Sequence, residues 1–220
     1  MELDKKLLSS LENEKEPILH LYDWEGESAT YGYFIKPLDY FNSEGVSKHG
    51  LNLARRPTGG GIVFHNCDLA FSVLVPASFP SFSLNPLDNY HFINHRVMSA
   101  IQQLLKDLSI ELLPEELQYM DLPSSNFCMA KPTKFDVMIR GKKVCGAAMR
   151  KTRQGYLYQG SILLGFLSDD YLRDLLIAGK QVIEKMRQNS LAILGENWTF
   201  NELQETRRHL RELLQHAFSF

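Results

Sequence analysis

The chain contains stretches in which apolar residues return every three or four positions, the spacing that predicts amphipathic helices. The longest is His91–Leu108, where Val97, Ile101 and Leu104 fall on one helical face. The same spacing predicts helices at Met1–Glu12, Pro37–His49, Asp169–Ile177 and Asn201–Phe218. No residue precedes the first of these to cap it, so we expect either a frayed first turn or a natural start further upstream.

Short apolar or alternating stretches predict strands between these helices. They are Ile18–Tyr22, Ala29–Phe34, Leu51–Ala54, Ile62–Phe64, Ala70–Val75, Lys134–Arg140, Lys143–Met149 and Tyr156–Leu163. Turn residues at Gly141 and Gln154-Gly155 separate the last three, which predicts two consecutive hairpins. The polar stretch Pro114–Pro132 is predicted to be a long loop, and long loops inside compact domains are often functional. The mixture indicates an α/β or α+β protein.

Composition and charge narrow the class of protein further. The length of 220 residues suits one domain, which we expect to span residues 1–220. Lys and Arg number 24 and Asp and Glu 26, and this near-balance argues against nucleic acid or a membrane as partner. Three cysteines are too few for a disulfide scaffold, and an odd number cannot all be paired. The charged N-terminus lacks the apolar core of a signal peptide. We therefore expect a cytoplasmic protein.

A glycine-rich run is the strongest local signal for chemistry. It comprises Gly59, Gly60 and Gly61. Three glycines on a tight connection between strands permit positive φ and let backbone amides approach a ligand closely. Arg55 and Arg56 precede the run and could hold a carboxylate or phosphate, and His65 follows it. The alternative is a hairpin turn with incidental surface arginines.

A lysine hairpin is the second signal. Lys143 opens a predicted strand and is followed by Gly146 and Ala147, small residues that leave room for a ligand. A lysine ammonium suits a phosphate or a developing oxyanion. The alternative is a solvated hairpin tip, where Lys142-Lys143 would have no chemical role. We expect Lys143 to be an exposed strand residue that contributes little to stability.

Together the two signals resemble a known family. Arg-Arg-x-Thr-Gly-Gly-Gly-x-Val-x-His, followed by Asp-x-x-x-x-Gly-x-Lys-x-x-Gly-x-Ala, is similar to motifs of the biotin/lipoate attachment family, nearest its lipoate–protein ligase and octanoyltransferase branch. Asp4 with Leu7-Leu8, Leu21–Trp24 and Tyr158–Ile162 extend the resemblance over nearly the whole chain. The Gly-Arg-Gly-Arg loop of biotin ligases is absent.

The resemblance implies a fold and a reaction. The fold would be α+β, related to class II aminoacyl-tRNA synthetases and biotin synthetases, with a mixed, mainly antiparallel sheet flanked by helices. As a lipoate–protein ligase, the protein would activate lipoate or octanoate with ATP and Mg²⁺ to acyl-AMP. It would then pass the acyl group to a lysine of lipoyl domains in 2-oxoacid dehydrogenase acyltransferase subunits or in the glycine cleavage H protein.

The resemblance also implies roles for particular residues. Lys143 would contact the acyl carbonyl and the adenylate phosphate, and Asp136 would face the nucleotide or its Mg²⁺. Trp24 would flank an apolar acyl tunnel, unless it is a plain packing residue. The other residues implied in substrate or nucleotide binding are Arg56, Thr58, Gly59, Gly60, Gly61, His65, Gly146, Ala147 and Gly160.

Cys128 leaves the type of reaction open. Cysteine-dependent octanoyltransferases carry a cysteine several residues before the corresponding acidic residue, and the spacing of Cys128 and Asp136 resembles theirs. Pro57 and the residues that follow His65 also resemble those enzymes. A thiolate at Cys128 would take octanoate from acyl carrier protein as a thioester. The alternative is an inert thiol, since reactivity depends on its surroundings.

We favour the ligase over the transferase on two features of the sequence. Gly61 offers a nucleotide phosphate a third unhindered backbone position, and the carboxylate of Asp136 can support Mg²⁺. A non-catalytic lipoyl-binding homologue is a third possibility, but such a protein has no need of Lys143.

Two expectations concern partners. The larger ligases of the family carry an additional C-terminal domain, whereas this sequence stops at Phe220. Either a separate accessory chain supports activation or the protein performs transfer alone. Lipoyl domains are acidic, so Arg150, Lys151 and Arg153 are candidates for contacting them, although a solvated turn is the simpler interpretation.

Overall fold

The computed structural model describes residues 1–115 and 123–219 and contains two sheets. The larger sheet has the strand order β1 (Ile18–Leu21), β5 (Asp68–Pro76), β9 (Gly155–Leu163), β8 (Lys142–Lys151), β7 (Val137–Ile139) and β6 (Ile110–Leu112), and all its neighbours are antiparallel. The smaller sheet orders β3 (Asn52–Arg55), β2 (Ser28–Tyr31) and β4 (Val63–Phe64), with β2 and β3 parallel. The expected mixed, mainly antiparallel α+β fold is confirmed.

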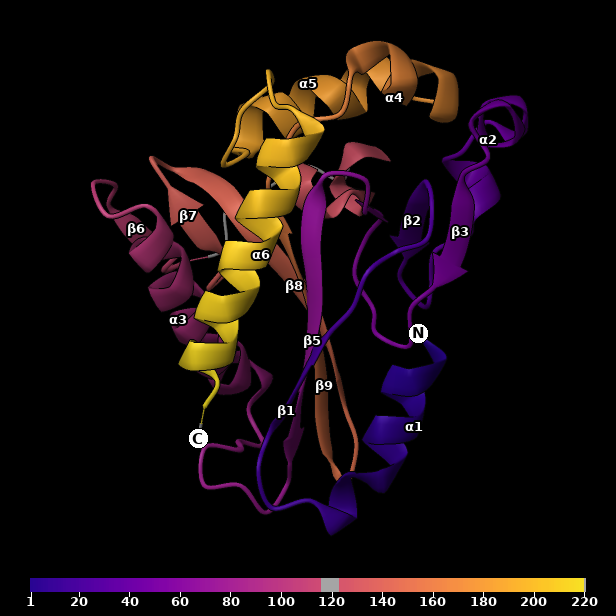
Figure 1. Cartoon of the computed structure of the whole chain (residues 1–220). Coiled ribbons are helices and arrows are strands. Elements are labelled where there is room, and N and C mark those ends of the chain that lie inside the picture. The colour runs from indigo at the N-terminus through magenta and orange to yellow at the C-terminus, as the bar shows by residue number, and fades with distance from the viewer. Residues whose placement is uncertain (116–122, 220) are drawn as a thin grey trace.

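Helices pack around the two sheets (Figure 1). They are α1 (Glu2–Ser10), α2 (Ser43–His49), α3 (Pro86–Leu104), α4 (Asp169–Leu175), α5 (Gly179–Asn189) and α6 (Phe200–Ala217). Helices α3 and α6 pack together on one face over the main core, which contains Phe71, Val97 and Leu210. On the other face α1 buries Leu8 and Leu11 against Leu74 and Leu157.

Most predicted elements are present, and the departures have local causes. The predicted helix Pro37–His49 is a 3₁₀ turn, Pro37–Asp39, followed by α2, because the side chain of Asn42 caps a new helix by accepting from the Glu44 amide. Helix α3 starts at Pro86 rather than His91, because Asn85 caps it and proline suits the first helical position. Sequence analysis missed α5 and β6 entirely.

The long loop predicted at 114–132 contains two short 3₁₀ helices, Pro123–Asn126 and Cys128–Ala130. Its residues 116–122 lie outside the described residues. Cys128 begins the second 3₁₀ helix, which packs against α5 and β8. Nowhere in the described chain is a helix both long and apolar enough to cross a membrane.

Strand β9 divides its side chains between the main core and the opposite face. Tyr158 and Ile162 enter the main core, whereas Gln159 and Ser161 point to the other side, where they form hydrogen bonds. Because successive strand residues face opposite ways, a fully buried strand can present polar groups to one side only. Gly146 of β8 pairs with Ser161, so the candidate site around Gly146 lies on that polar side.

Helix α6 begins with a complete capping box, which gives a test of its contribution to stability. The Thr199 hydroxyl accepts from the Glu202 amide, and the Glu202 carboxylate accepts from the Thr199 amide. We expect Thr199→Ala to lower the free energy of unfolding by about 1 kcal/mol, measured by urea denaturation. Thr199→Ser keeps the cap and should remain within experimental error of the wild type. Equal stability of the Ala variant would show that the cap is unimportant.

Candidate active site

Lys143 is buried in an ion pair, contrary to the expectation of an exposed lysine. Its Nζ lies 2.7 Å from Asp136 Oδ2 and donates to the Lys131 carbonyl at 3.2 Å, and the residue is only 2% exposed. Burial by itself lowers the pKa of Lys143, but the neighbouring Asp136 carboxylate more than offsets this and leaves the pKa above its usual value. The site therefore holds a permanent positive charge.

A β-bulge turns Lys143 toward the site. Met138 of β7 pairs with Lys143, whereas the preceding Val137 pairs with Cys145, so Val144 is an extra residue in β8. In a regular strand Lys143 and Gly146 would point to opposite faces. The bulge breaks the alternation, and the end of the Lys143 side chain lies directly over Gly146.

Asp136 is held by its neighbours as well as by Lys143. Its Oδ2 accepts from the Thr133 amide at 2.7 Å and from the Thr133 hydroxyl at 3.0 Å. The residue before it, Phe135, has a φ of 67°, a left-handed conformation that is costly for a bulky residue and often marks a functional site. Its carbonyl accepts from Asn94 Nδ2 at 2.7 Å, which helps to hold the turn.

The predicted contact of Asp136 with Mg²⁺ gains no support from this geometry. Its carboxylate is engaged by an internal cation and by Thr133. Among the residues that the structure describes, no group of three or more His, Cys, Asp or Glu residues could hold a metal ion. The magnesium role stays a prediction.

The sulfur of Cys128 and the ammonium of Lys143 both lie next to Gly146. A Cβ atom added to Gly146 would stand 2.6 Å from Cys128 Sγ and 2.7 Å from Lys143 Nζ, so both groups border the same point. Cys128 is partly exposed, whereas Cys67 and Cys145 are buried. Burial raises the pKa of the Cys67 thiol to about 12 and that of the Cys145 thiol further, so at neutral pH both are protonated packing residues.

The glycine run positions the Cys128 segment. The amide of Ile62 donates to the Asn126 carbonyl at 2.6 Å, and the amide of Cys128 donates to the Ile62 carbonyl at 3.0 Å. A Cβ on Gly61 would lie 2.2 Å from the Asn126 carbonyl oxygen, so only glycine permits this approach. The segment that carries Cys128 therefore fills the position of a Gly61 side chain, and the phosphate role of Gly61 stays a prediction.

Arg56 supports the same loop from inside. It is 6% exposed, and its guanidinium donates to the Gly61 carbonyl at 2.6 Å, the Gly59 carbonyl at 3.2 Å and the Thr30 hydroxyl at 2.7 Å. Gly60 adopts a φ of 78°, which is consistent with the predicted tight connection. Most donors of Arg56 are therefore used to shape the loop rather than left free for an anion.

His65 is fixed on both ring nitrogens. Nδ1 lies 2.8 Å from Asp68 Oδ2, Nε2 lies 2.8 Å from Thr30 Oγ1, and Trp24 stacks on the ring at 4.2 Å. Asp68 Oδ2 also accepts from the Ser161 hydroxyl at 2.6 Å. With both ring nitrogens hydrogen-bonded and Trp24 stacked on its ring, His65 is held in one orientation.

A second chain of hydrogen bonds links the loop to α1. Thr58 Oγ1 donates to Gln159 Oε1 at 2.7 Å, and Gln159 Nε2 donates to Asp4 Oδ2 at 2.6 Å. Asp4 is fully buried and also accepts from Ser72, while His20 lies 2.7 Å from its other oxygen. Thr58 therefore positions the pocket wall.

A pocket of about 310 Å³ collects the predicted residues around Cys128, and we call it the Cys128 pocket. Predicted residues that line it are Trp24, Arg56, His65, Cys128, Gly146, Ala147 and Gly160. Lys143 and Asp136 adjoin it at Gly146, whereas Thr58, Gly59, Gly60 and Gly61 stand behind its lining. Lining residues that sequence analysis missed are Met1, Tyr22, Thr30, Val63, Ala148, Gln159 and Ser161.

One signal could have revealed some of the missed residues. Thr30, Gln159 and Ser161 are polar residues at buried positions of predicted strands. A buried hydroxyl or amide requires a hydrogen-bond partner, so such residues mark either a polar network or a ligand. Met1 has no such signal, because its approach to Gln159 depends on how α1 docks.

Comparison with known proteins identifies the family. Residues 1–207 match the sequence model of the lipoyl protein ligase A/B catalytic domain. The chain belongs to this family. It is similar to the octanoyltransferase LipM of Bacillus subtilis (32% identical, covering 86% of this chain and 69% of the relative) and to that of Anoxybacillus flavithermus (32%, 93% and 77%). A crystal structure of lipoate-protein ligase A bound with ATP matches with a TM-score of 0.68 and 25% identity, covering 96% of this chain and 78% of that one.

Membership of the lipoyl protein ligase A/B family makes this chain an enzyme of the lipoyl or octanoyl transfer kind. It also confirms the class II synthetase-like fold, which the lipoate-protein ligase structures share. The third interpretation, a non-catalytic lipoyl-binding homologue, is thereby set aside.

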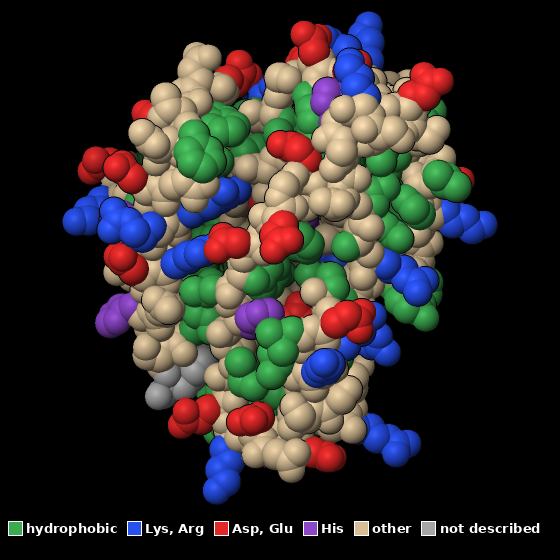
Figure 2. Space-filling view, turned by 45° about the vertical axis from the view of Figure 1, so that its right-hand side comes forward, with side chains coloured by type: hydrophobic (Ala, Val, Ile, Leu, Met, Phe, Trp, Pro, Cys, Tyr) green, Lys and Arg blue, Asp and Glu red, His purple; other side chains and the backbone are tan. Residues whose placement is uncertain are grey.

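The basic residues expected to contact a lipoyl domain lie far from Lys143. Lys151 ends β8 and Lys143 lies next to its start, so at about 3.3 Å per residue the two are roughly 25 Å apart. Arg150 donates to the Pro57 carbonyl and Lys151 to the Leu84 carbonyl. This placement favours the simpler interpretation of Arg150, Lys151 and Arg153, a solvated turn. Figure 2 shows acidic and basic side chains interspersed on the visible face, in keeping with the net charge of −2.

The buried ion pair predicts a stability effect opposite to that expected for an exposed lysine. Lys143→Ala should destabilise this family member by about 3–5 kcal/mol, because it leaves Asp136 buried without its counter-charge. The double variant Lys143→Met/Asp136→Asn should recover at least half of that loss while remaining inactive. Chemical denaturation with an acyl-transfer assay measures both. A stable Lys143→Ala variant would contradict the role of the ion pair.

Gly146 provides a second test of the site. An added methyl group would collide with both Cys128 Sγ and Lys143 Nζ, so Gly146→Ala should displace both reactive groups. A displacement of about 1 Å can cost about a hundredfold in rate, and we expect a loss of that order in kcat/KM. A methyl group added at Gly59 would lie in open space, so Gly59→Ala should have the same melting temperature as the wild type. Unchanged activity of Gly146→Ala would remove Cys128 and Lys143 from a shared site.

Proposed function

We propose that the protein is an octanoyltransferase that moves an octanoyl group from acyl carrier protein to a lysine of a lipoyl domain through a thioester on Cys128. The observation that carries the proposal is that Cys128 Sγ and Lys143 Nζ border one point above Gly146, at the edge of the Cys128 pocket. A nucleophile and a cation that converge on one position suit a carbonyl that is attacked while its oxygen becomes negative.

The first half-reaction forms the thioester on the enzyme. Cys128, as thiolate, attacks the carbonyl carbon of the donor thioester, and the carbonyl oxygen takes up the negative charge. Lys143 is charged and buried, so its ammonium stabilises this oxyanion more strongly than it would in water. The intermediate collapses, the donor leaves as its thiolate, and the octanoyl group remains on Cys128. The alkyl chain lies in the Cys128 pocket, beside Trp24 and Ala148.

The second half-reaction releases the product. The neutral amine of the lipoyl-domain lysine attacks the same carbonyl, and the carbon–sulfur bond to Cys128 breaks. The leaving Cys128 sulfur takes up a proton lost by the amine, so the products are an octanoyl amide and the free thiol. A thioester is already an activated acyl group, and the sequence of steps therefore needs neither ATP nor Mg²⁺.

The two features that favoured the ligase in the sequence have other roles in the structure. The space at Gly61 is filled by the segment that carries Cys128, and the carboxylate of Asp136 binds Lys143. The similarity to proteins named octanoyltransferase LipM supports the same preference. We therefore rank the transferase above the ATP-dependent ligase, which reverses the order reached from the sequence.

The ligase is kept as a second candidate because of one specific similarity. The structural relative at 25% identity is a lipoate-protein ligase A bound with ATP. In that case lipoate, ATP and Mg²⁺ would give lipoyl-AMP beside Lys143, with a separate accessory chain if activation requires one. The acceptors in both cases would be lipoyl domains of 2-oxoacid dehydrogenases or the glycine cleavage H protein.

Incubation with octanoyl acyl carrier protein tests the proposal directly. Intact-mass spectrometry should show one octanoyl group on the wild type, removable by hydroxylamine, and none on Cys128→Ser. Transfer to an apo lipoyl domain should fall by at least roughly a thousandfold in Cys128→Ser, as expected when a covalent nucleophile is removed. Cys145→Ser is the matched control and should load normally, since that thiol is buried in the main core and does not line the Cys128 pocket.

A parallel reaction with lipoate and ATP distinguishes the two candidates. Protein-bound lipoyl-AMP, together with full activity of Cys128→Ser, would establish the ligase and overturn the transferase. Thioester formation without any adenylate would support the transferase.

A further inference from the structure

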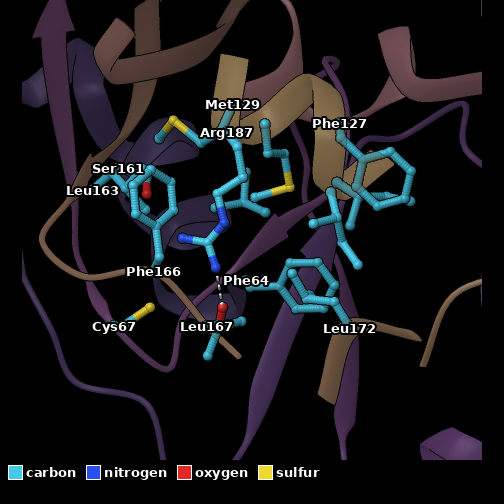
Figure 3. Close-up of a pocket in the computed structure, with 14 residues that line it drawn as sticks. Phe64, Cys67, Phe127, Met129, Ser161, Leu163, Phe166, Leu167, Leu172 and Arg187 are labelled. Atoms are coloured by element: carbon cyan, nitrogen blue, oxygen red, sulfur yellow. Dashed lines mark hydrogen bonds between the residues drawn. The ribbon is translucent and has the colours of Figure 1, made fainter. Parts of the chain in front are cut away.

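A second, largely apolar pocket lies on the other side of the Cys128 segment (Figure 3). We call it the Arg187 pocket after the cation that lines it. Phe127 and Met129, the two neighbours of Cys128 in the chain, belong to its wall. Val63 and Ser161 line both this pocket and the Cys128 pocket, so the two cavities share a wall close to the sulfur.

The Arg187 pocket continues to the surface. Phe166, Leu167 and Arg187 line it and also line a polar surface groove, which includes Asp169 and Trp198. Figure 3 shows the Arg187 guanidinium between Phe166 and Phe64, pointing at Leu167. The groove, the Arg187 pocket and the wall beside Cys128 thus adjoin through shared residues, and we call this succession the path.

We infer that this path receives the phosphopantetheine arm of the acyl carrier protein that delivers the octanoyl thioester to Cys128. The inference rests on the proposed function, because only a thioester donor brings such an arm. It deepens that function by giving the donor's arm an approach separate from the pocket of the acyl chain. The arm carries its thioester at the inner end and one phosphodiester at the outer end, with a mostly uncharged chain between.

The chemistry of the path matches that ligand. Its inner part is formed by apolar side chains such as Phe127, Met129 and Ile183, which suit the uncharged portion of the arm. Its outer part contains Arg187, whose Nη1 forms no hydrogen bond but is ion-paired with Glu196 at 3.4 Å. Arg187 Nη2 donates to the Leu167 carbonyl and to Asp169, so a phosphate oxygen would replace the Glu196 carboxylate at Nη1.

The same charges disfavour other occupants. Within the described part of the pocket lining, Arg187 is the cation, and two carboxylates, Asp169 and Glu196, face it. One partly compensated cation fits a phosphodiester with a single charge better than a triphosphate. The lysine of an incoming lipoyl domain would be repelled by Arg187 and would gain nothing from the apolar walls. The acceptor therefore has to reach Cys128 from elsewhere.

The two half-reactions provide the test, because only the first involves the donor's arm. Met186→Trp enlarges a half-buried side chain of the pocket wall, and Arg187→Gln removes the cation. The matched controls are Gln181→Trp, on the exposed side of α5, and Lys185→Gln, which removes a charge from the same helix outside the pocket lining. Thermal melting of each variant establishes that it is folded.

Loading of Cys128 is measured with four octanoyl donors: the acyl carrier protein, phosphopantetheine, pantetheine and N-acetylcysteamine thioesters. Met186→Trp should raise KM at least tenfold for the acyl carrier protein and phosphopantetheine donors and leave loading by the short N-acetylcysteamine donor within twofold. Arg187→Gln should raise KM severalfold for the phosphorylated donor and leave the dephosphorylated pantetheine thioester unchanged. Both controls should match the wild type with every donor.

Variants loaded through the short donor are then mixed with an apo lipoyl domain. Transfer should proceed at the wild-type rate in Met186→Trp. Slower transfer would assign the path to the acceptor. An unchanged KM for all donors would show that the pocket is only a packing defect, whether or not the variant is more stable. Either result overturns the inference but leaves the Cys128 thioester intact. If wild-type Cys128 loads from none of the donors, the proposed function itself fails, and the inference falls with it.

Discussion

The buried pair of Lys143 and Asp136 is the interaction on which the site depends. A charge inside a protein is tolerated only beside an opposite charge with its remaining hydrogen bonds satisfied, and here Thr133 and the Lys131 carbonyl complete the set. The strained turn at Phe135 and the bulge in β8 are the backbone features that bring the two side chains together. In return, the site keeps a fixed positive charge in a medium of low polarity, where it acts strongly on a developing oxyanion.

The glycine run and Cys128 form one structural unit. Gly61 lets the backbone of residues 126–128 approach, and Arg56 holds the run in shape through its carbonyls. The position of Cys128 relative to Lys143 is therefore set by main-chain hydrogen bonds between two distant segments, not by side-chain packing alone. In the sequence, the glycines of this run suggest phosphate binding. In the structure they support Cys128, the residue whose proposed thioester chemistry would need no nucleotide.

Much of the fold could be predicted from local patterns, because apolar periodicity and turn residues determine the long helices and hairpins. Gly50 and Gly141 adopt the positive φ that their turn positions suggested. The motif residues Lys143, Asp136 and Cys128 could be named, but not their burial or pairing, since these depend on a bulge and on long-range contacts. Asp4 and Gln159 illustrate the limit: their hydrogen bond joins residues 155 positions apart in the chain, and no local pattern encodes it.

A covalent transfer mechanism places a particular demand on this architecture. One sulfur atom has to meet a large donor, retain an alkyl chain after the donor leaves, and then meet a large acceptor. A single pocket would force the departing donor thiol and the retained chain to share one channel. In the proposed transfer, two pockets that share the wall of Val63 and Ser161 would remove that conflict, because the chain would stay on one side while the other side empties. Cys128 lies on a short 3₁₀ helix and its chain neighbours Phe127 and Met129 line the Arg187 pocket, so its sulfur would be reached from both sides.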